Sequence, residues 1–227
     1  MLFYLIFLAD VKIIHLLCIS KFFKEMSQED YLKDLSEIKN LMSKSSKFIS
    51  LNGLSGILAG VYALIGAGYA FWLVSQSGQE YLSLDGTVFR LVILDLLIVG
   101  TLSVGTAIFL TTKKASKNDE QIWDSLTKRL LTSFIVPLVA GGIYILIILH
   151  QQPYGQTAAL MLLFYGLALL NASKYTLGDI KYLGYTQTIL GLLCAILPDF
   201  GFWFWTLGFG VMHVIYGASM FYKYDRK

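Results

Sequence analysis

Charge is scarce in this chain. Only 15% of its 227 residues are Asp, Glu, Lys or Arg, whereas 56% are hydrophobic, and a typical soluble domain is about 25% charged. Too few polar groups are present to cover the surface of a globular protein in water. The mean hydropathy of +0.63 indicates that the chain folds in a lipid bilayer. The net charge of +3 gives no reason to expect a nucleic-acid partner.

Reactive and metal-binding motifs are also lacking. The two cysteines, Cys18 and Cys194, lie in different apolar segments with no partner at metal-ligand spacing, so neither a disulfide framework nor a zinc site is expected. The sequence contains no GxSxG, HExxH or DxD motif and no Gly-rich phosphate loop. We therefore expect no catalytic residue, no cofactor and no metal, and a protein that is not an enzyme.

The sequence contains long apolar segments. Six of them are near the roughly 20 residues that cross a bilayer as a helix. They are residues 50–74, 88–111, 130–149, 157–172, 180–198 and 201–222. None alternates as the strands of a membrane barrel do. The pattern predicts an all-α polytopic membrane protein, with a six-transmembrane-helix bundle at 50–222 and a cytoplasmic tail at 223–227.

Basic residues gather on one side of this predicted bundle. All 18 Lys and Arg residues except Arg90 fall in the N-terminal region, in the second and fourth loops or in the tail. The other three loops, SQSGQEYLSLDG, HQQPYGQ and PDFG, contain none. Because cytoplasmic loops carry an excess of Lys and Arg, we expect both termini in the cytoplasm and the protein in a bacterial inner membrane.

The N-terminal region divides into two parts. Residues 1–25 are apolar but carry ionisable side chains and lack the features of a signal peptide. They form an interfacial helix or a seventh span or, as we favour, precede a true start at Met26. Residues 26–49 have apolar residues at helical spacing opposite a charged face. This predicts a cytoplasmic amphipathic helix, with a cytoplasmic protein partner at residues 28–48 as one interpretation.

Two ionisable side chains that suggest a function lie well inside the predicted spans, away from their ends. Asp95 lies in the outer half of the second span, and His213 lies near the middle of the sixth. Because an ionisable group in the hydrocarbon costs roughly 3 kcal/mol or more, each suggests a function. Together with Gln187 and Tyr216 they are candidates for a transport path. The alternative is structural: His213 and Gln187 bond other helices, and Asp95 pairs with Arg90 or with water.

Glycines suggest where the helices pack closely. Two of them have GxxxG spacing in the first span, and another two lie on one face of the sixth span around His213. Since glycine has no side chain, a neighbouring helix can approach its backbone. We assign six glycines to helix packing: Gly56, Gly60, Gly141, Gly142, Gly210 and Gly217.

Several stretches together resemble a family of small six-helix integral membrane proteins from Bacteroidota whose activity is uncharacterised. They are YLKDLSEIKNLMSKSSKFISLNGLSGILAGVYALIGA, IWDSLTKRLL, PLVAGG, FYGLALLNASKYTLGDIKYLG and LGFGVMHVIYG. The resemblance covers roughly residues 28–222 and implies a fold without implying an activity or site residues. A looser resemblance, to HdeD-like acid-stress membrane proteins, rests on the Gly-rich helix, Pro turn and second helix of LGYTQTILGLLCAILPDFGFWFWTLGFGVMHVIYGASMF.

These patterns favour a non-enzymatic integral membrane protein that acts as a scaffold, a sensor or a stress-related protein. The alternative is a small transporter or channel with Asp95 and His213 on a polar path. The transporter requires Asp95, Gln187 and His213 to face one water-accessible cavity. The scaffold requires a dry core and an exposed apolar stripe on helix 28–48.

Overall fold

The N-terminal part of the chain forms a unit separate from the helical bundle. The structure, a computed structural model, describes residues 32–36, 38, 52–78, 86–117, 123–151 and 154–226. Its contacts divide the chain into residues 1–46 and residues 47–227. In the first unit, residues 32–36 and 38 are helical, and Leu32, Leu35 and Ile38 are exposed. The other residues of the predicted segments 1–25 and 26–49, Cys18 among them, lie outside the described residues.

The second unit is built from long apolar helices. Over the described ranges, five helical segments are long and apolar enough to cross a membrane. They are α3 (Gly53–Ser77), α4 (Thr87–Lys117), α5 (Ser125–Gln151), α6 (Thr157–Ala172) continued by the 3-10 turn η2 (Ser173–Tyr175), and Pro198–Tyr224. A sixth apolar helix, α7 (Ile180–Ile196), has 17 residues, at the lower limit for a span. The predicted all-α polytopic membrane bundle is confirmed.

The last helical segment, Pro198–Asp225, is not a uniform α-helix. It consists of the 3-10 turn η3 (Pro198–Phe200), α8 (Gly201–Trp205), the π-helical turn η4 (Thr206–Met212), α9 (His213–Met220) and the π-helical turn η5 (Phe221–Asp225). We call this whole segment the last helix. The sequence pattern predicts one regular span here, because apolar composition does not distinguish an α-turn from a π-turn.

Local side-chain signals mark the ends of the helices. At the start of α3, the side-chain oxygen of Asn52 accepts a hydrogen bond from the backbone N–H of Leu54 at 2.9 Å. Gly78 ends this helix with a φ of 64°, a value that glycine adopts without steric cost. Before α5, Asp124 Oδ1 accepts from the backbone N–H of Thr127 at 2.7 Å. This hydrogen bond lowers the pKa of Asp124 from its usual 3.8.

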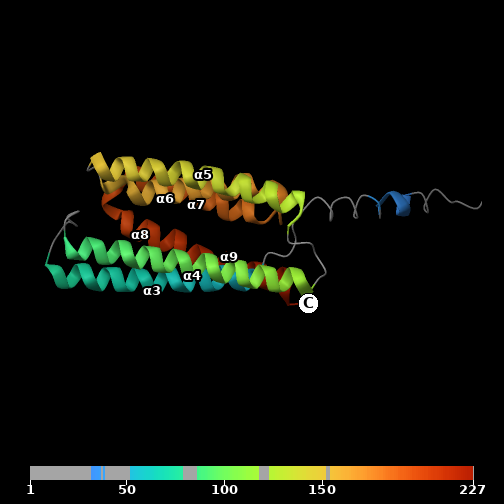
Figure 1. The fold of residues 1–227 in the computed structure, drawn as a ribbon, viewed down its shortest axis with the longest axis horizontal. Helices are drawn as coiled ribbons and strands as arrows, with labels where there is room; N and C mark the ends of the chain where they lie inside the picture. Colours follow the sequence, from blue (N-terminus) through green and yellow to red (C-terminus); the bar gives the residue numbers. More distant parts are fainter. Residues whose placement is uncertain are drawn as a thin grey trace, which may run out of the picture. The chain divides into compact units, whose positions relative to one another are not determined.

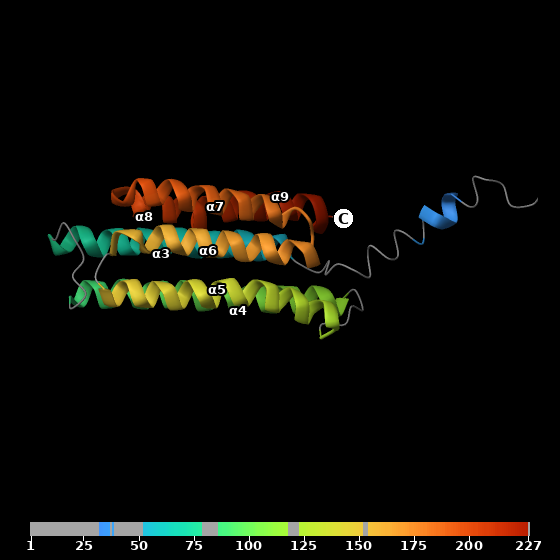
Figure 2. The same ribbon diagram turned by 90° about the horizontal axis from the view of Figure 1, so that it is seen from above.

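The last helix connects the other helices of the bundle. α4 packs mainly against α3, while α6 packs against both α5 and α7. Figure 1 shows the α3–α4 pair on one side, the α5–α6–α7 group on the other, and α8 and α9 running between them. In Figure 2, α4 and α5 lie along the same edge of the bundle, opposite α7 and α9. Because α9 and η4 contact α3, and α8 contacts α6, the last helix joins the two sides.

Many large apolar side chains point away from the bundle. In α4 the buried residue is Ala115, while Leu97 is 61% exposed and Phe109 is 64% exposed. A soluble monomer rarely exposes a continuous apolar surface of this extent. Lipid tails solvate such a surface without cost, so the exposed faces of α4 and α5 indicate contact with a bilayer.

Glycine backbones form the contact between α3 and the last helix. A Cβ atom at Gly60 would lie 2.7 Å from the carbonyl oxygen of Gly210, and one at Gly56 would lie 3.1 Å from the Cα of Gly217. The neighbouring atoms are backbone atoms, which do not move aside as a side-chain end does. Any side chain at these positions would therefore separate the two helices.

The two glycines of α5 differ in their surroundings. A Cβ at Gly141 would clash with the ring of Phe164 on α6, whereas one at Gly142 would meet no described atom within 4 Å. Successive helical residues point about 100° apart, so only one glycine of the pair faces α6. The contacts within this bundle therefore give Gly142 no packing role, unlike the assignment made from the sequence.

We expect Gly60→Ala to lower the thermal stability of the protein, because the new methyl group would lie 2.7 Å from the Gly210 carbonyl oxygen. Overpacking of this kind costs about 1–3 kcal/mol. Gly100→Ala in α4 is the matched control, since its Cβ would meet no described atom within 4 Å. The measurement is the melting temperature of each variant in detergent. Equal melting temperatures for Gly60→Ala and Gly100→Ala would contradict the close contact between Gly60 and Gly210.

Candidate functional site

A group of polar side chains lies in the interior of the bundle. Gln187 on α7 is 0% exposed and His213 on α9 is 7% exposed. Tyr165 Oη on α6 lies 2.8 Å from His213 Nε2, and Gln187 Nε2 donates to the carbonyl oxygen of Gly208 at 2.8 Å. The same carbonyl oxygen lies 3.0 Å from His213 Nδ1. We call Tyr165, Gln187, Gly208 and His213 the polar cluster.

The hydrogen-bond partners determine where the protons lie. A carbonyl oxygen accepts only, so His213 Nδ1 carries the proton that it donates to Gly208. The neutral ring then has an acceptor at Nε2, to which the Tyr165 hydroxyl donates. Gln187 Nε2 lies 3.4 Å from His213 Nδ1, but both nitrogens donate to the Gly208 oxygen, which has two lone pairs. All three side chains therefore bond within one network.

The π-helical turn η4 presents the Gly208 carbonyl to these side chains. A π-turn widens the helix locally and changes the backbone pairing. The backbone N–H of His213 donates to the Gly210 carbonyl, and the Gly208 oxygen accepts from the side chains of Gln187 and His213. A Cβ at Gly208 would lie 2.6 Å from Gln187 Oε1. Only glycine at this position lets Gln187 approach the carbonyl.

Aromatic rings enclose the polar cluster. The Phe209 ring lies 5.1 Å from that of Tyr165 and 5.9 Å from that of His213, measured between centroids. Phe209 also packs on Trp205 at 5.2 Å, and Phe134 meets Tyr165 edge-on at 6.1 Å. This arrangement keeps water and lipid away from the hydrogen bonds, which strengthens them.

Tyr216 lies on α9 beyond the polar cluster. It packs against a buried apolar group made of Leu169, Ile180 and Leu183. Its hydroxyl is buried and has no hydrogen-bond partner among the described residues, and the same holds for Gln187 Oε1. Of the four residues predicted for a polar path, the structure brings Gln187 and His213 into direct contact, and Tyr216 follows them along α9.

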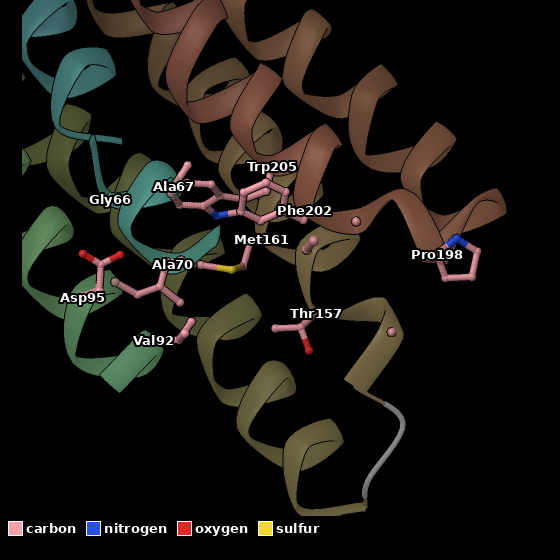
Figure 3. A pocket seen from close by; sticks show the side chains of 14 residues that line it. Gly66, Ala67, Ala70, Val92, Asp95, Thr157, Met161, Pro198, Phe202 and Trp205 are labelled. Carbon is pink, nitrogen blue, oxygen red and sulfur yellow. The ribbon is translucent and has the colours of Figure 1, made fainter. Parts of the chain in front are cut away.

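Asp95 lies in a different place, at a cavity of about 280 Å³. We call it the Asp95 cavity; its walls come from α3, α4, α6, the turn before α6 and the start of the last helix (Figure 3). The carboxylate packs against Gly66, where a Cβ would lie 3.0 Å from Oδ2. Gln187, His213 and Tyr216 do not line this cavity. The predicted path residues therefore do not share one cavity.

The expected partner of Asp95 is absent from its surroundings. Arg90 is exposed, and the ion pair found between residues of the described ranges joins Lys223 to Asp179 instead. Arg90 lies more than one helical turn before Asp95, so the two side chains leave α4 in different directions. The pairing suggested as a structural alternative for Asp95 does not form.

Two residues that line the Asp95 cavity each carry a buried polar atom. Thr157, the first residue of α6, and Trp205, the last residue of α8, both line it. Thr157 Oγ1 and Trp205 Nε1 are buried and have no hydrogen-bond partner within the part of the chain that is described. The sequence analysis assigned no role to Thr157. For Trp205 the sequence offers one general indication: a Trp side chain carries an N–H donor, which usually has a hydrogen-bond partner when it is buried.

The opposite end of the bundle carries an exposed charge pair. Asp179, in the turn before α7, accepts hydrogen bonds from Lys223 Nζ and from Tyr224 Oη of the last helix. The bond from Lys223 is the main cause that lowers the pKa of Asp179 from its usual 3.8. No group of three metal-ligating side chains occurs in the residues that the structure describes.

Comparisons with protein families, with curated proteins and with solved structures found no match to this chain. The resemblances to the Bacteroidota family and to HdeD-like proteins therefore stay predictions. The fold and the two sites define the class of protein as an all-α, multi-pass membrane bundle that has a closed polar cluster and a separate cavity.

We expect Tyr165→Phe to destabilise the bundle by about 0.5–1.5 kcal/mol, because His213 Nε2 would lose its donor. His213→Phe should cost more, since it removes a donor and an acceptor together. Tyr182→Phe is the control, because Tyr182 is 59% exposed on α7. The free energies of unfolding of the wild type and of the three variants are measured by equilibrium unfolding in detergent.

The double variant Tyr165→Phe/His213→Phe tests whether the two residues act together. Side chains in one network are coupled, so the two losses should not add. Additive losses, or a Tyr165→Phe variant as stable as Tyr182→Phe, would show that the hydrogen bond contributes nothing.

Proposed function

We propose that the protein is a non-enzymatic integral protein of a bacterial inner membrane that acts as a sensor or scaffold. Its output surface is the segment 28–48, for which the sequence predicts a cytoplasmic amphipathic helix, and a cytoplasmic protein partner docks there. The observation that carries this proposal is the closed polar cluster: Gln187 and His213 bond to Gly208 in a nearly inaccessible interior. Residues on a conduction path need contact with water, whereas Gln187 Nε2 and both ring nitrogens of His213 have hydrogen-bond partners within the protein.

The exposed apolar side chains of the first unit support the output surface. Leu32, Leu35 and Ile38 are 61%, 61% and 53% exposed. Their spacing places them along one side of a helix. A stripe of this kind is what a helix-binding partner or a membrane surface recognises.

The proposed orientation has both termini in the cytoplasm. It is supported by the basic residues, of which all but Arg90 fall in alternate connections or in the terminal regions. The resemblance to membrane proteins of Bacteroidota supports the choice of a bacterial inner membrane.

Cysteine labelling tests this orientation. Gln156 and Lys181 are both exposed and lie at the two ends of the α6–α7 hairpin. In a background with Cys18 and Cys194 changed to alanine, we expect a membrane-impermeant maleimide to label Gln156→Cys in spheroplasts. Lys181→Cys should react only after the membrane is permeabilised. The reverse pattern would invert the topology.

A small transporter or channel is the second candidate, and the position of Asp95 favours it. This carboxylate lies inside a predicted span, lines a cavity and has no ion-pair partner among the described residues. Intramembrane carboxylates in such places often belong to ion pathways.

Proteoliposomes separate the two candidates. We expect the wild-type protein to pass protons or potassium no faster than protein-free liposomes under an imposed gradient, as reported by an enclosed pH dye. Asp95→Asn should behave in the same way. A flux through the wild type that disappears in Asp95→Asn would make the transporter the better description.

A further inference from the structure

The start of α7 and the end of the last helix meet at one corner of the bundle. Asp179, in the turn before α7, accepts hydrogen bonds from Lys223 Nζ and Tyr224 Oη of the last helix. These bonds pair the Asp179 carboxylate with a cation and hold the two helix ends together. The segments that meet here, 174–181 and 223–227, contain five Lys or Arg residues and two Asp residues. Positive charge therefore exceeds negative charge at this corner.

The Lys181 side chain lies over the ring of the next residue. Its Nζ is 5.0 Å from the centre of the Tyr182 ring, and Tyr182 is 59% exposed. Lys181 forms no ion pair with another residue of the described ranges. Tyrosine rings favour the boundary between the hydrocarbon and the lipid headgroups. The contact with Tyr182 therefore places an ammonium group at the level of the headgroups, on the lipid-facing side of α7.

This lipid-facing side continues along α7 into the hydrocarbon. Its most exposed large side chains follow one another at intervals of three or four residues, which places them along one side of the helix. They are Tyr182, Tyr185, Ile189, Leu192 and Ile196, each between 54% and 74% exposed. We call these five residues the α7 stripe. A lipid acyl chain can lie along the stripe directly below the Lys181 ammonium group.

The length of α7 brings headgroups close to Lys181. The helix has 17 residues and is about 26 Å long, whereas the hydrocarbon core is about 30 Å thick. A bilayer adapts to a short span by local thinning, and flanking cations extend to the headgroups. Because Lys181 is the second residue of α7, a headgroup beside this helix lies within reach of its side chain.

The charge at this corner restricts the kind of lipid. A zwitterionic headgroup carries a cation next to its phosphate, and Lys181 repels that cation. An anionic phospholipid offers the phosphate without the cation, and Lys or Arg residues near a membrane surface attract such lipids. A soluble acidic partner would meet the charge but not the α7 stripe, which faces the hydrocarbon. One molecule with a phosphate and an acyl chain fits both.

We propose that Lys181 and the α7 stripe bind one anionic phospholipid of the surrounding bilayer. The phosphate pairs with the Lys181 ammonium group, the Tyr182 ring packs at the boundary below it, and an acyl chain follows the stripe. Lys223 stays with Asp179, so this bond keeps the last helix in place beside the site. The interaction is independent of whether the protein acts as a sensor, a scaffold or a transporter.

Two phospholipids that differ only in their headgroups test the assignment. Dioleoylphosphatidylglycerol and dioleoylphosphatidylcholine have the same acyl chains, but only the first carries a net negative charge. Each is added to the full chain in detergent, and native mass spectrometry measures the affinity for the first bound lipid. We expect phosphatidylglycerol to bind about fivefold or more tightly than phosphatidylcholine, which is the preference that one basic residue at a membrane surface provides.

Variants assign this preference to Lys181. Lys181→Gln should bring the two affinities close together, whereas Lys181→Arg should keep the preference because it keeps the charge. Arg90→Gln is the matched control, since it removes one exposed positive charge at the opposite end of the bundle. Lys113→Gln removes one near the end of α4, away from the α7 stripe. Both of these variants should keep the wild-type preference.

Any of three results would overturn the proposal. In the first, the wild-type protein binds the two lipids equally, a result that needs no variant to fold. In the second, Lys181→Gln retains the full preference for phosphatidylglycerol. In the third, Lys113→Gln loses as much of the preference as Lys181→Gln does, which would show a general attraction of anionic lipid to the basic end instead of a site on α7.

Discussion

One backbone carbonyl, that of Gly208, organises the interior of this bundle. In a bilayer, polar groups have no water to bond and must find partners within the protein. The Gly208 oxygen accepts from Gln187 on α7 and from His213 on the last helix, and Tyr165 adds α6 through the other side of the imidazole ring. The hydrogen bonds centred on this acceptor thus join α6, α7 and the last helix. The glycine contact of the last helix with α3 then places the α3–α4 pair.

The position of the Asp95 cavity follows from this arrangement. The α3–α4 pair and the α5–α6–α7 group are joined mainly by the last helix, and the cavity lies where α3, α4 and α6 approach its first turns. Gly66, Ala67 and Ala70 are too small to fill the space between the two sides. Close packing at Gly56, Gly60 and Gly66 and the cavity beside Ala67 and Ala70 come from the same choice of small residues along α3.

The sequence predicts the helices better than it predicts the site. Apolar segments of spanning length identify all six, because this signal depends only on composition and length. It also identifies His213 and Gln187 as polar residues within spans, but not their partners. Gly208 joins the polar cluster in a π-helical turn, which leaves no mark in the hydrophobic pattern. Tyr165 joins it from α6 through the contact with His213. Whether Asp95 meets Arg90 depends likewise on side-chain direction.

The polar cluster and the surroundings of the Asp95 cavity have opposite effects on the stability of the bundle. The polar cluster pairs both nitrogens of the His213 ring, which stabilises the bundle. Beside the Asp95 cavity, Thr157 Oγ1 and Trp205 Nε1 are buried without partners among the described residues, which lowers the stability of the bundle. Proteins tolerate such a loss of stability at functional sites because favourable packing elsewhere in the fold compensates for it. Trp205 lies at the boundary between the two: it lines the cavity, and its ring packs on Phe209, which in turn packs on His213. The packing around the cavity is therefore continuous with the aromatic rings that cover the polar cluster.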